Sequence, residues 1–84
     1  MYSVILSRSA ERFLNGLSGK DYNLVSAAVS SLVANPYQSG CKKLKGYKEM
    51  FRIRAGNYRI LYQVDGEKLI VEIFEVGNRR NVYD

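Results

Sequence analysis

The strongest constraint on the fold is the alternating run "FRIRAGNYRILYQVDGEKLIVEIFEV" at residues 51–76. Apolar and polar side chains alternate through most of it, which is typical of strands that bury one face. Gly56-Asn57 suits a two-residue turn, and Asp65-Gly66 is a strong hairpin signal. The pattern predicts three antiparallel strands, at residues 47–55, 58–64 and 68–76, and the short tail is compatible with one more strand.

The first half of the chain predicts one strand followed by two helices. The run "YSVIL" at residues 2–6 is rich in strand formers, and apolar residues then recur at helical spacing through residues 8–17 and 20–34. Ser7 is expected to cap the first helix, Ser18 and Asp21 resemble a capping box for the second, and Pro36 stops it. We therefore expect an α+β fold in the order β-α-α-β-β-β, with two N-terminal helices packed on one face of an antiparallel-rich sheet.

Size and composition fit a single domain over residues 1–84, and the 46% of hydrophobic residues suffices for one core. Cys41 is the only cysteine, so an internal disulfide is excluded and a reducing cytoplasm is expected. The sequence has no signal-peptide pattern and no apolar run near the ~20 residues of a membrane span, so no membrane partner is expected. It has no histidine and no metal-ligand spacing, so neither a metal nor a cofactor is expected.

The net charge of +5 favours a polyanionic partner about as strongly as it favours a solvated surface with surplus Lys and Arg. The longest irregular connection, "NPYQSGCKKLKGYKE" at residues 35–49, carries Lys42, Lys43, Lys45 and Lys48. These lysines form either a solvated loop or an electrostatic contact for an RNA backbone.

Strand parity sorts the alternating residues into two faces. If Gly56-Asn57 is the turn, Ala55 lies opposite Tyr58 and the two residues share a face. The predicted core face then holds Phe51, Ile53, Ala55, Tyr58, Ile60, Tyr62, Leu69, Val71 and Ile73. The opposite side, which we call the arginine face after Arg52, Arg54 and Arg59, also holds Lys48, Leu61, Gln63, Ile70, Glu72 and Phe74.

On the arginine face, Arg54 is predicted to lie directly opposite Arg59. Like charges in such positions destabilise a sheet, so the pair requires an explanation. Either Glu72 neutralises it, or the two side chains bind an external anion. The planar donor fork of arginine matches phosphate oxygens, and Arg79 and Arg80 add to the same cluster, so we favour the anion.

These residues resemble a known family. The segment "LKGYKEMFRIRAGNYRILYQVDGEKLIVEIFEVGNRRNVYD", residues 44–84, resembles the C-terminal half of the RelE/ParE toxin superfamily. The shared pattern is a strand reading aromatic-basic-apolar-basic, a turn, "YR-apolar-apolar-Y", a later glycine, a basic cluster and a terminal tyrosine. The helix pair after "YSVIL" fits the N-terminal half. The resemblance implies a RelE-like fold, related to that of microbial ribonucleases.

The resemblance also implies the toxin of a type II toxin–antitoxin system, neutralised by a cognate antitoxin. Toxins of the RelE branch enter the ribosomal A site and cleave mRNA, whereas those of the ParE branch poison DNA gyrase. This sequence is more similar to the RelE branch. Positions matching the RelE catalytic set hold Arg52, Arg54, Arg59, Arg79 and Tyr83. The two basic strand residues that match Arg52 and Arg54 are usually lysines in RelE. Asn78 stands near the position where many relatives have histidine.

The expected function is therefore a ribosome-dependent endoribonuclease that needs no metal and uses the 2′-hydroxyl of the mRNA as nucleophile. Arg59 and Arg79 would stabilise the phosphate, and Arg52 and Arg54 would orient the backbone. Tyr83 would stack on a base, hold the 2′-hydroxyl or act as the base. The residues expected to bind RNA around this centre are Lys42, Lys43, Lys45, Lys48 and Arg80.

Three alternatives stay open at this point: a ParE-like gyrase inhibitor without nuclease activity, a non-catalytic RNA-binding member of the family, and an inactive member. The expected partners are the antitoxin, the ribosome and mRNA. The free toxin is expected to be a monomer and the toxin–antitoxin complex a higher-order assembly.

Overall fold

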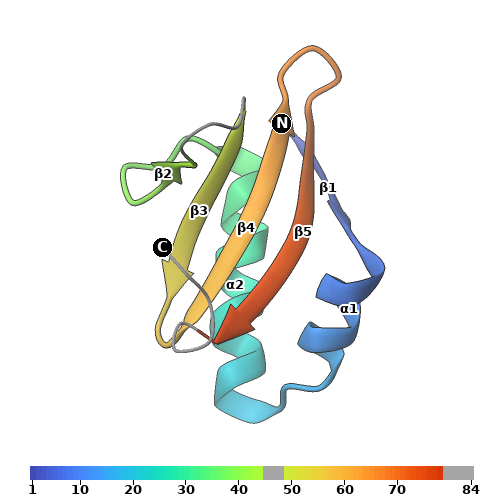
Figure 1. Ribbon diagram of the computed structural model, residues 1–84, viewed down its shortest axis with the longest axis vertical. Helices are drawn as coiled ribbons and strands as arrows, with labels where there is room; N and C mark the ends of the chain where they lie inside the picture. Colours follow the sequence, from blue (N-terminus) through green and yellow to red (C-terminus); the bar gives the residue numbers. More distant parts are fainter. Residues whose placement is uncertain (45–48, 79–84) are drawn as a thin grey trace.

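The computed structural model describes residues 1–44 and 49–78, which form two helices packed against one face of a five-stranded sheet (Figure 1). Strand β1 (Ser3–Leu6) leads into helices α1 (Arg8–Asn15) and α2 (Gly19–Ala34). Strands β2 (Lys42–Lys43), β3 (Met50–Ala55), β4 (Tyr58–Asp65) and β5 (Ile70–Asn78) follow. The predicted α+β class and element order are confirmed, and the two-residue strand β2 is an addition.

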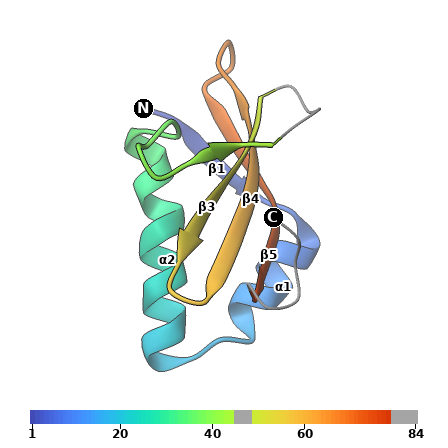
Figure 2. The ribbon, with the colours of Figure 1, turned by 60° about the vertical axis from the view of Figure 1, so that its left-hand side comes forward.

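The strand order across the sheet is β1-β5-β4-β3-β2. The ladder from β2 to β5 is antiparallel, and β1 joins it in parallel beside β5, so that Val4 pairs with Val71 and Leu6 with Ile73. A parallel neighbour needs a crossover connection, and the two helices with the remaining chain supply it. Figure 2 shows α2 running along one side of this twisted sheet.

The helices begin where small polar residues permit it. Ser7 Oγ accepts a hydrogen bond from the Ala10 amide at 3.1 Å, which confirms the predicted cap of α1. The predicted capping box of α2 is wrong, since Ser18 stands at the N-cap but makes no side-chain cap bond within the described chain. Gly19 instead takes a left-handed φ of 55° at the first position of the helix.

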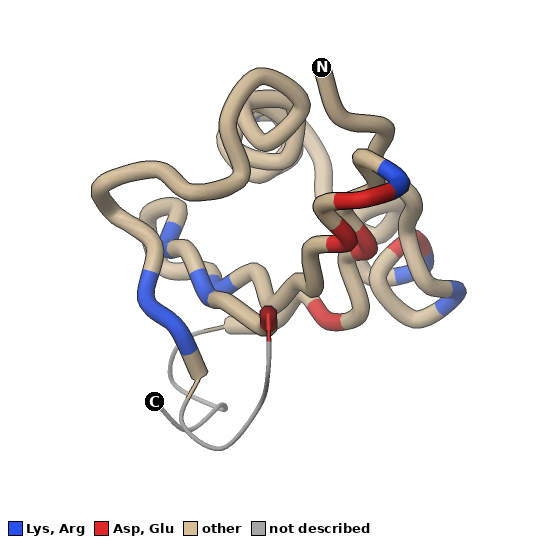
Figure 3. The backbone as a smooth tube through the Cα atoms, turned by 90° about the horizontal axis from the view of Figure 1, so that it is seen from above, with Lys and Arg blue, Asp and Glu red and all other residues tan. Residues whose placement is uncertain are grey.

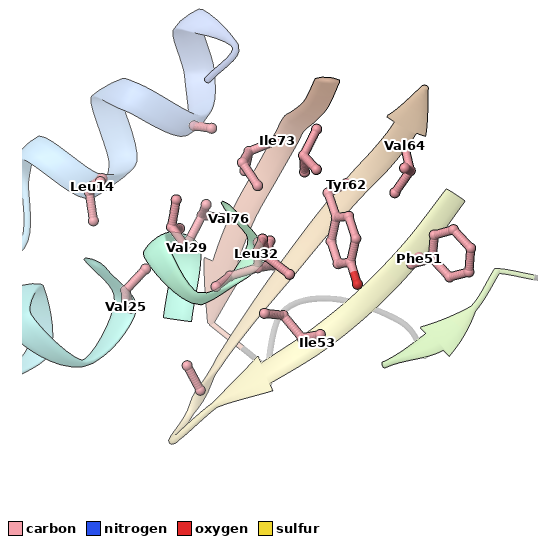
Figure 4. Close-up of a cluster of buried hydrophobic side chains, with 14 residues drawn as sticks. Leu14, Val25, Val29, Leu32, Phe51, Ile53, Tyr62, Val64, Ile73 and Val76 are labelled. Carbon is pink, nitrogen blue, oxygen red and sulfur yellow. The ribbon is translucent and has the colours of Figure 1, made fainter. Parts of the chain in front are cut away.

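One core lies between the helices and the sheet (Figure 4). Its fully buried members include Val25 and Leu32 from α2 and Ile60 and Tyr62 from β4. The Tyr62 hydroxyl donates a 2.6 Å hydrogen bond to the Pro36 carbonyl oxygen, which satisfies the polar end of this ring inside the core. Burial raises the pKa of the Tyr62 phenol well above its usual value.

The last hairpin has the longer of the two turns, of two or four residues, that the sequence allows with the same parity, so Val71 and Ile73 lie in the core as expected. Asp65 pairs with Ile70, so four residues form the turn and β5 begins two positions later than expected. Leu69, expected on the core face, is 43% exposed and has a left-handed φ of 56°. It lies in the turn, where strand parity does not apply.

Candidate functional site

The β3–β4 turn sets the register of the arginine face. Gly56 has a φ of 61°, and a Cβ built on it would lie 2.5 Å from Leu24 Cδ2 of helix α2. Glycine at the first central position with positive φ suits the short hairpin turns whose twist matches that of the strands. Ala55 therefore pairs with Tyr58, and Arg54 lies directly opposite Arg59, as predicted.

Two cross-strand rows form the site. The first runs through Lys42, Arg52, Leu61 and Glu75, one residue from each of β2 to β5. The second runs through Arg54, Arg59 and Gly77. Directly opposite residues on an antiparallel pair have Cβ atoms about 5 Å apart and share a face. The structure thus brings together the three arginines predicted from strand parity.

The three arginines differ in exposure. Arg52 is 7% exposed and Arg59 is 3% exposed, whereas Arg54 is open to solvent. Buried side chains have little freedom, so the fold determines where the charges of Arg52 and Arg59 lie. Glycine at position 77 places no side chain beside Arg59 on β5. The arrangement presents one accessible guanidinium beside two that are held by the sheet.

The carboxylates near the arginines are not arranged as predicted. An irregularity between Leu61 and Tyr62 shifts the pairing with β5, so that Leu61 faces Glu75 while Tyr62 faces Ile73. Glu72, the expected neutralising neighbour, pairs with Gln63. That position is four residues along β4 from Arg59, or about 13 Å at 3.3 Å per residue. Glu75, one row from Arg59, is the nearer carboxylate in register.

The basic residues of the long connection divide between the two faces. Lys42 pairs with Arg52 and therefore joins the arginine face, whereas Lys43 pairs with Phe51 on the other side. Both lysines are exposed. Five further predicted site residues lie outside the described residues: Lys45, Lys48, Arg79, Arg80 and Tyr83. The described part of β5 ends at Asn78, opposite Tyr58 and one pair beyond Arg59.

Charge is unevenly distributed around the sheet. Viewed along the long axis of the molecule, Figure 3 shows only Lys and Arg positions on one side, and Asp and Glu positions mixed with further Lys and Arg positions on the other. Within residues 1–44 and 49–78, no cluster of His, Cys, Asp or Glu has the size needed to hold a metal ion. Neither of the two described helices is long and apolar enough to cross a membrane.

Sequence reasoning missed the bulge in β5, although a signal for it exists. The buried residues of this strand are Val71, Ile73 and Val76, so the spacing changes from two to three. Such a break in alternation is typical of a β-bulge, where two residues oppose one. It moves Glu75 and Gly77 to the arginine face. The pairing of β2 with β3 carried no comparable signal, because two lysines after a cysteine do not form a strand pattern.

Comparisons with known proteins identify a matching family. Residues 4–83 match the family described as the ParE toxin of the type II toxin–antitoxin system, parDE. A curated relative, Toxin RelE3 of Methanocaldococcus jannaschii, is 42% identical over 50 residues, which are 60% of this chain and 54% of the relative. The aligned part thus spans about half the length of that relative.

Three solved structures share the fold. The isolated RelE toxin of E. coli superposes with a TM-score of 0.81 at 22% identity, covering 93% of this chain and 84% of RelE. The RelE–RelB complex of Pyrococcus horikoshii gives a TM-score of 0.82 at 22% identity over 96% and 98% of the chains. The RelBE2 complex of Mycobacterium tuberculosis gives 0.77 at 28% identity over 93% and 98%. The chain therefore belongs to the ParE toxin family of type II toxin–antitoxin systems, on its RelE-like branch.

Proposed function

We propose that this chain is the toxin of a type II toxin–antitoxin system and that it cleaves translated mRNA in the ribosomal A site. The observation that carries the proposal is the pairing of Arg54 with Arg59 across β3 and β4, with Arg52 one row away. This arrangement suits a phosphodiester, because the exposed Arg54 offers a planar donor fork for its oxygens and the buried Arg52 and Arg59 add positive charge beside it. The match to RelE toxins supports the same assignment.

In the proposed reaction, the 2′-hydroxyl of the mRNA gives its proton to Tyr83, acting as the base, or to water, and its oxygen forms a bond to the adjacent phosphorus. The bond from phosphorus to the 5′-oxygen breaks, the 5′-oxygen takes up a proton, and a 2′,3′-cyclic phosphate remains. Arg59 and Arg79 stabilise the negative charge that develops on the phosphate oxygens. Arg52 and the exposed Arg54 orient the backbone, and Tyr83 stacks on a base or holds the 2′-hydroxyl.

The chain has no histidine, and arginine keeps its proton at neutral pH, so it has no obvious general acid. We propose that ribosomal RNA or water protonates the leaving oxygen. The nuclease then depends on the ribosome, and RNA contacts by Lys42, Lys43, Lys45, Lys48 and Arg80 help to hold the transcript. Action on the ribosome implies that the protein works in the cytoplasm.

The test is to map mRNA 5′ ends in a translation extract with and without the purified protein. We expect new ends within codons of translated regions and little cutting of the same RNA without ribosomes. Arg12→Gln is a matched control, because it removes an exposed guanidinium from α1, away from the arginine face. Vigorous cutting of naked mRNA would refute ribosome dependence, and unchanged transcripts in the extract would refute the nuclease.

A second candidate function follows from the family match, whose description names ParE toxins. In that case the chain inhibits DNA gyrase and does not cut RNA. Purified gyrase would then lose supercoiling activity in the presence of the protein, while mRNA in the translation extract stays intact. Unchanged supercoiling by gyrase together with cleaved mRNA would instead assign the chain to the nuclease class.

We further propose a cognate antitoxin as the protein partner, with a monomeric free toxin and a higher-order complex. RelE–RelB complexes among the similar structures support this partner. A basic toxin surface is complementary to an acidic antitoxin segment.

A further inference from the structure

Glu75 is an exposed carboxylate that lies on the arginine face. It pairs with Leu61 in the first row, next to the second row, in which Arg59 pairs with Gly77. Glu75 and Arg59 are therefore diagonal neighbours on adjacent strands, and the Cβ atoms of such neighbours lie about 7 Å apart, within reach of long side chains. A carboxylate in this place repels a phosphodiester. Its presence beside Arg59 therefore calls for an explanation, as the pairing of Arg54 with Arg59 does.

The bulge in β5 is the reason that Glu75 lies on this face. It adds one residue, Phe74, between Ile73 and Glu75, and so turns Glu75 away from the core. The Phe74 carbonyl oxygen accepts a hydrogen bond from the Ser7 hydroxyl at 3.0 Å and a longer one from the Ser9 hydroxyl at 3.5 Å. These bonds tie the bulge to the start of α1, so the backbone that carries Glu75 is held in place.

The Glu75 carboxylate is available to a ligand on the arginine face. Within residues 1–44 and 49–78, it makes no hydrogen bond and no ion pair. Gly77, the next residue of β5 on the same face, has no side chain, so a phosphate held by Arg59 has space beside Glu75. Glu72 is also exposed on this face of β5, but it lies about 13 Å from Arg59 along the strand direction.

We propose that Glu75 is the general base of the cleavage reaction. The inference rests on the proposed nuclease function and assigns the proton transfer that this function leaves to Tyr83 or water. Glu75 accepts the 2′-hydroxyl proton, directly or through that water, while the 2′-oxygen bonds to phosphorus and the bond from phosphorus to the 5′-oxygen breaks. The 5′-oxygen takes a proton from ribosomal RNA or water, and Glu75 then releases its proton to the solvent. Arg59, one row away, holds the phosphate.

The chemistry of the step favours a carboxylate over the other groups on this face. Arginine side chains keep their protons, so they cannot accept another one. A phenol has an ordinary pKa of about 10 and is protonated at neutral pH, whereas a carboxylate is ionised there. A base placed beside the reacting hydroxyl typically contributes about 100-fold to 10,000-fold to the rate.

The first test removes the carboxylate. Ribosomes that carry mRNA in an open A site are mixed with excess protein, and the rate of a single round of cleavage is measured. Glu75→Gln should cleave about 100-fold more slowly than the unmodified protein. Glu72→Gln is the matched control, because it removes the same charge from an exposed position of the same strand and face, and its rate should stay within about twofold. Equal rates for the two variants would overturn the proposal.

The second test separates chemistry from binding. An mRNA with a 2′-O-methyl group at each A-site nucleotide cannot be cleaved, so the affinity of the protein for the ribosome complex can be measured directly. Glu75→Gln should bind as tightly as the unmodified protein or about threefold more tightly, since it removes a charge that repels RNA. A loss of affinity as large as the loss of rate would show that Glu75 only positions the RNA. Glu75→Asp keeps a carboxylate and should cleave at least about tenfold faster than Glu75→Gln.

The third test uses the pH dependence of the single-round rate. The charged side chains that face Glu75 from β2, β3 and β4 are Lys42, Arg52, Arg54 and Arg59, whose residue types stay protonated between pH 6 and pH 8. Strand β1 has no titratable side chain, and α1 packs on the other face. The unmodified protein should cleave at a nearly constant rate in this range, because the base is already ionised. The rate of Glu75→Gln should rise about tenfold per pH unit, since hydroxide must replace the carboxylate.

The assignment of the base and the nuclease function fail in different ways. Tyr83→Phe should keep the nearly constant pH profile, and a profile that becomes steep in Tyr83→Phe but not in Glu75→Gln would give the role to Tyr83. If the unmodified protein cleaves mRNA and Glu75→Gln does so equally fast, the base is refuted and the nuclease is supported. If the unmodified protein leaves translated mRNA intact, both are refuted.

Discussion

The two faces of the β3–β4 hairpin use neighbouring residues for opposite purposes. On the core face, Ile53 pairs with Ile60, and both are almost completely buried beneath the helices. One position along each strand, on the arginine face, Arg54 pairs with Arg59. The first pair stabilises the sheet by removing apolar surface from water, whereas the second places two like charges opposite one another, which by itself disfavours the pairing. On each strand, the residue that stabilises the core and the residue that carries the charge are therefore direct neighbours in the sequence.

The largest expected effect is on the core face. Ile60→Ala removes a fully buried side chain between Ile53 and Val76, and should lower the free energy of unfolding by about 4 kcal/mol through lost burial and a residual cavity. Urea unfolding followed by circular dichroism measures this loss. Gln63→Ala, at an exposed position of the same strand, is the control and should change stability by less than about 0.5 kcal/mol. A loss below about 1 kcal/mol for Ile60→Ala would mean that this face does not hold the fold.

The second expected effect is on the arginine face. Arg54→Gln removes the exposed guanidinium and the repulsion with Arg59, so stability should stay equal or rise slightly. The rate of mRNA cleavage in a translation extract should fall about 100-fold, or about 3 kcal/mol in activation free energy. Arg12→Gln should change neither quantity. If Arg54→Gln destabilises the protein as much as Ile60→Ala does, the assignment of stability to the core face and of activity to the arginine face is wrong.

The two faces also differed in how far the sequence predicts them. Alternation in residues 51–64 predicted both the Ile53–Ile60 and Arg54–Arg59 pairs, because a two-residue turn leaves only one register. The prediction of Glu72 as the neutralising neighbour failed because four residues form the last turn, so that Glu72 pairs with Gln63, whereas a two-residue turn at Asp65-Gly66 would have placed it opposite Arg59. Further along β5 a bulge breaks the alternation and brings Glu75 to the arginine face, and it is associated with the packing of Val76 in the core rather than with a turn residue.

The surroundings of the site could not be predicted from the sequence for a related reason. The groove of about 630 Å³ between α2 and β3 depends on how far apart the helix and the strand lie, which follows from side-chain volumes at Ala27 and Ala28 and from where β2 begins, at Lys42 opposite Arg52. Periodicity predicts that each element exists and which face it buries, but not the space left between them. The burial of Arg59 likewise depends on tertiary packing that alternation does not encode.

A smaller effect is expected where the core meets the connection before β2. Tyr62→Phe removes the hydroxyl that donates to the Pro36 carbonyl, and should cost about 2 kcal/mol of stability because that oxygen is left buried without this donor. Denaturant unfolding at neutral pH measures the loss. Tyr37→Phe, at a tyrosine that is 45% exposed, is the control and should have a much smaller effect.

The same residue also predicts a pH dependence. Because burial raises the pKa of Tyr62 in the folded state, the unfolded chain loses this proton first, near the ordinary value of about 10. The contribution to stability is fully present below that pH and is lost as the pH rises above it. The stability difference between the unmodified protein and Tyr62→Phe should therefore shrink above pH ~10. A difference that grows with pH would contradict the buried, protonated phenol.

The smallest effect concerns the turn that gives both faces their register. Gly56→Ala forces a side chain to adopt a φ of 61° and displaces the end of the Leu24 side chain, so we expect a loss of about 1 kcal/mol. Gly40→Ala is the matched control, since nothing lies within 4 Å of its Cβ position and stability should hold or rise slightly. Cleavage by Gly56→Ala should be retained. A slip of one residue would move Ile53 and Ile60 into water, and that burial, rather than the turn alone, keeps Arg54 opposite Arg59.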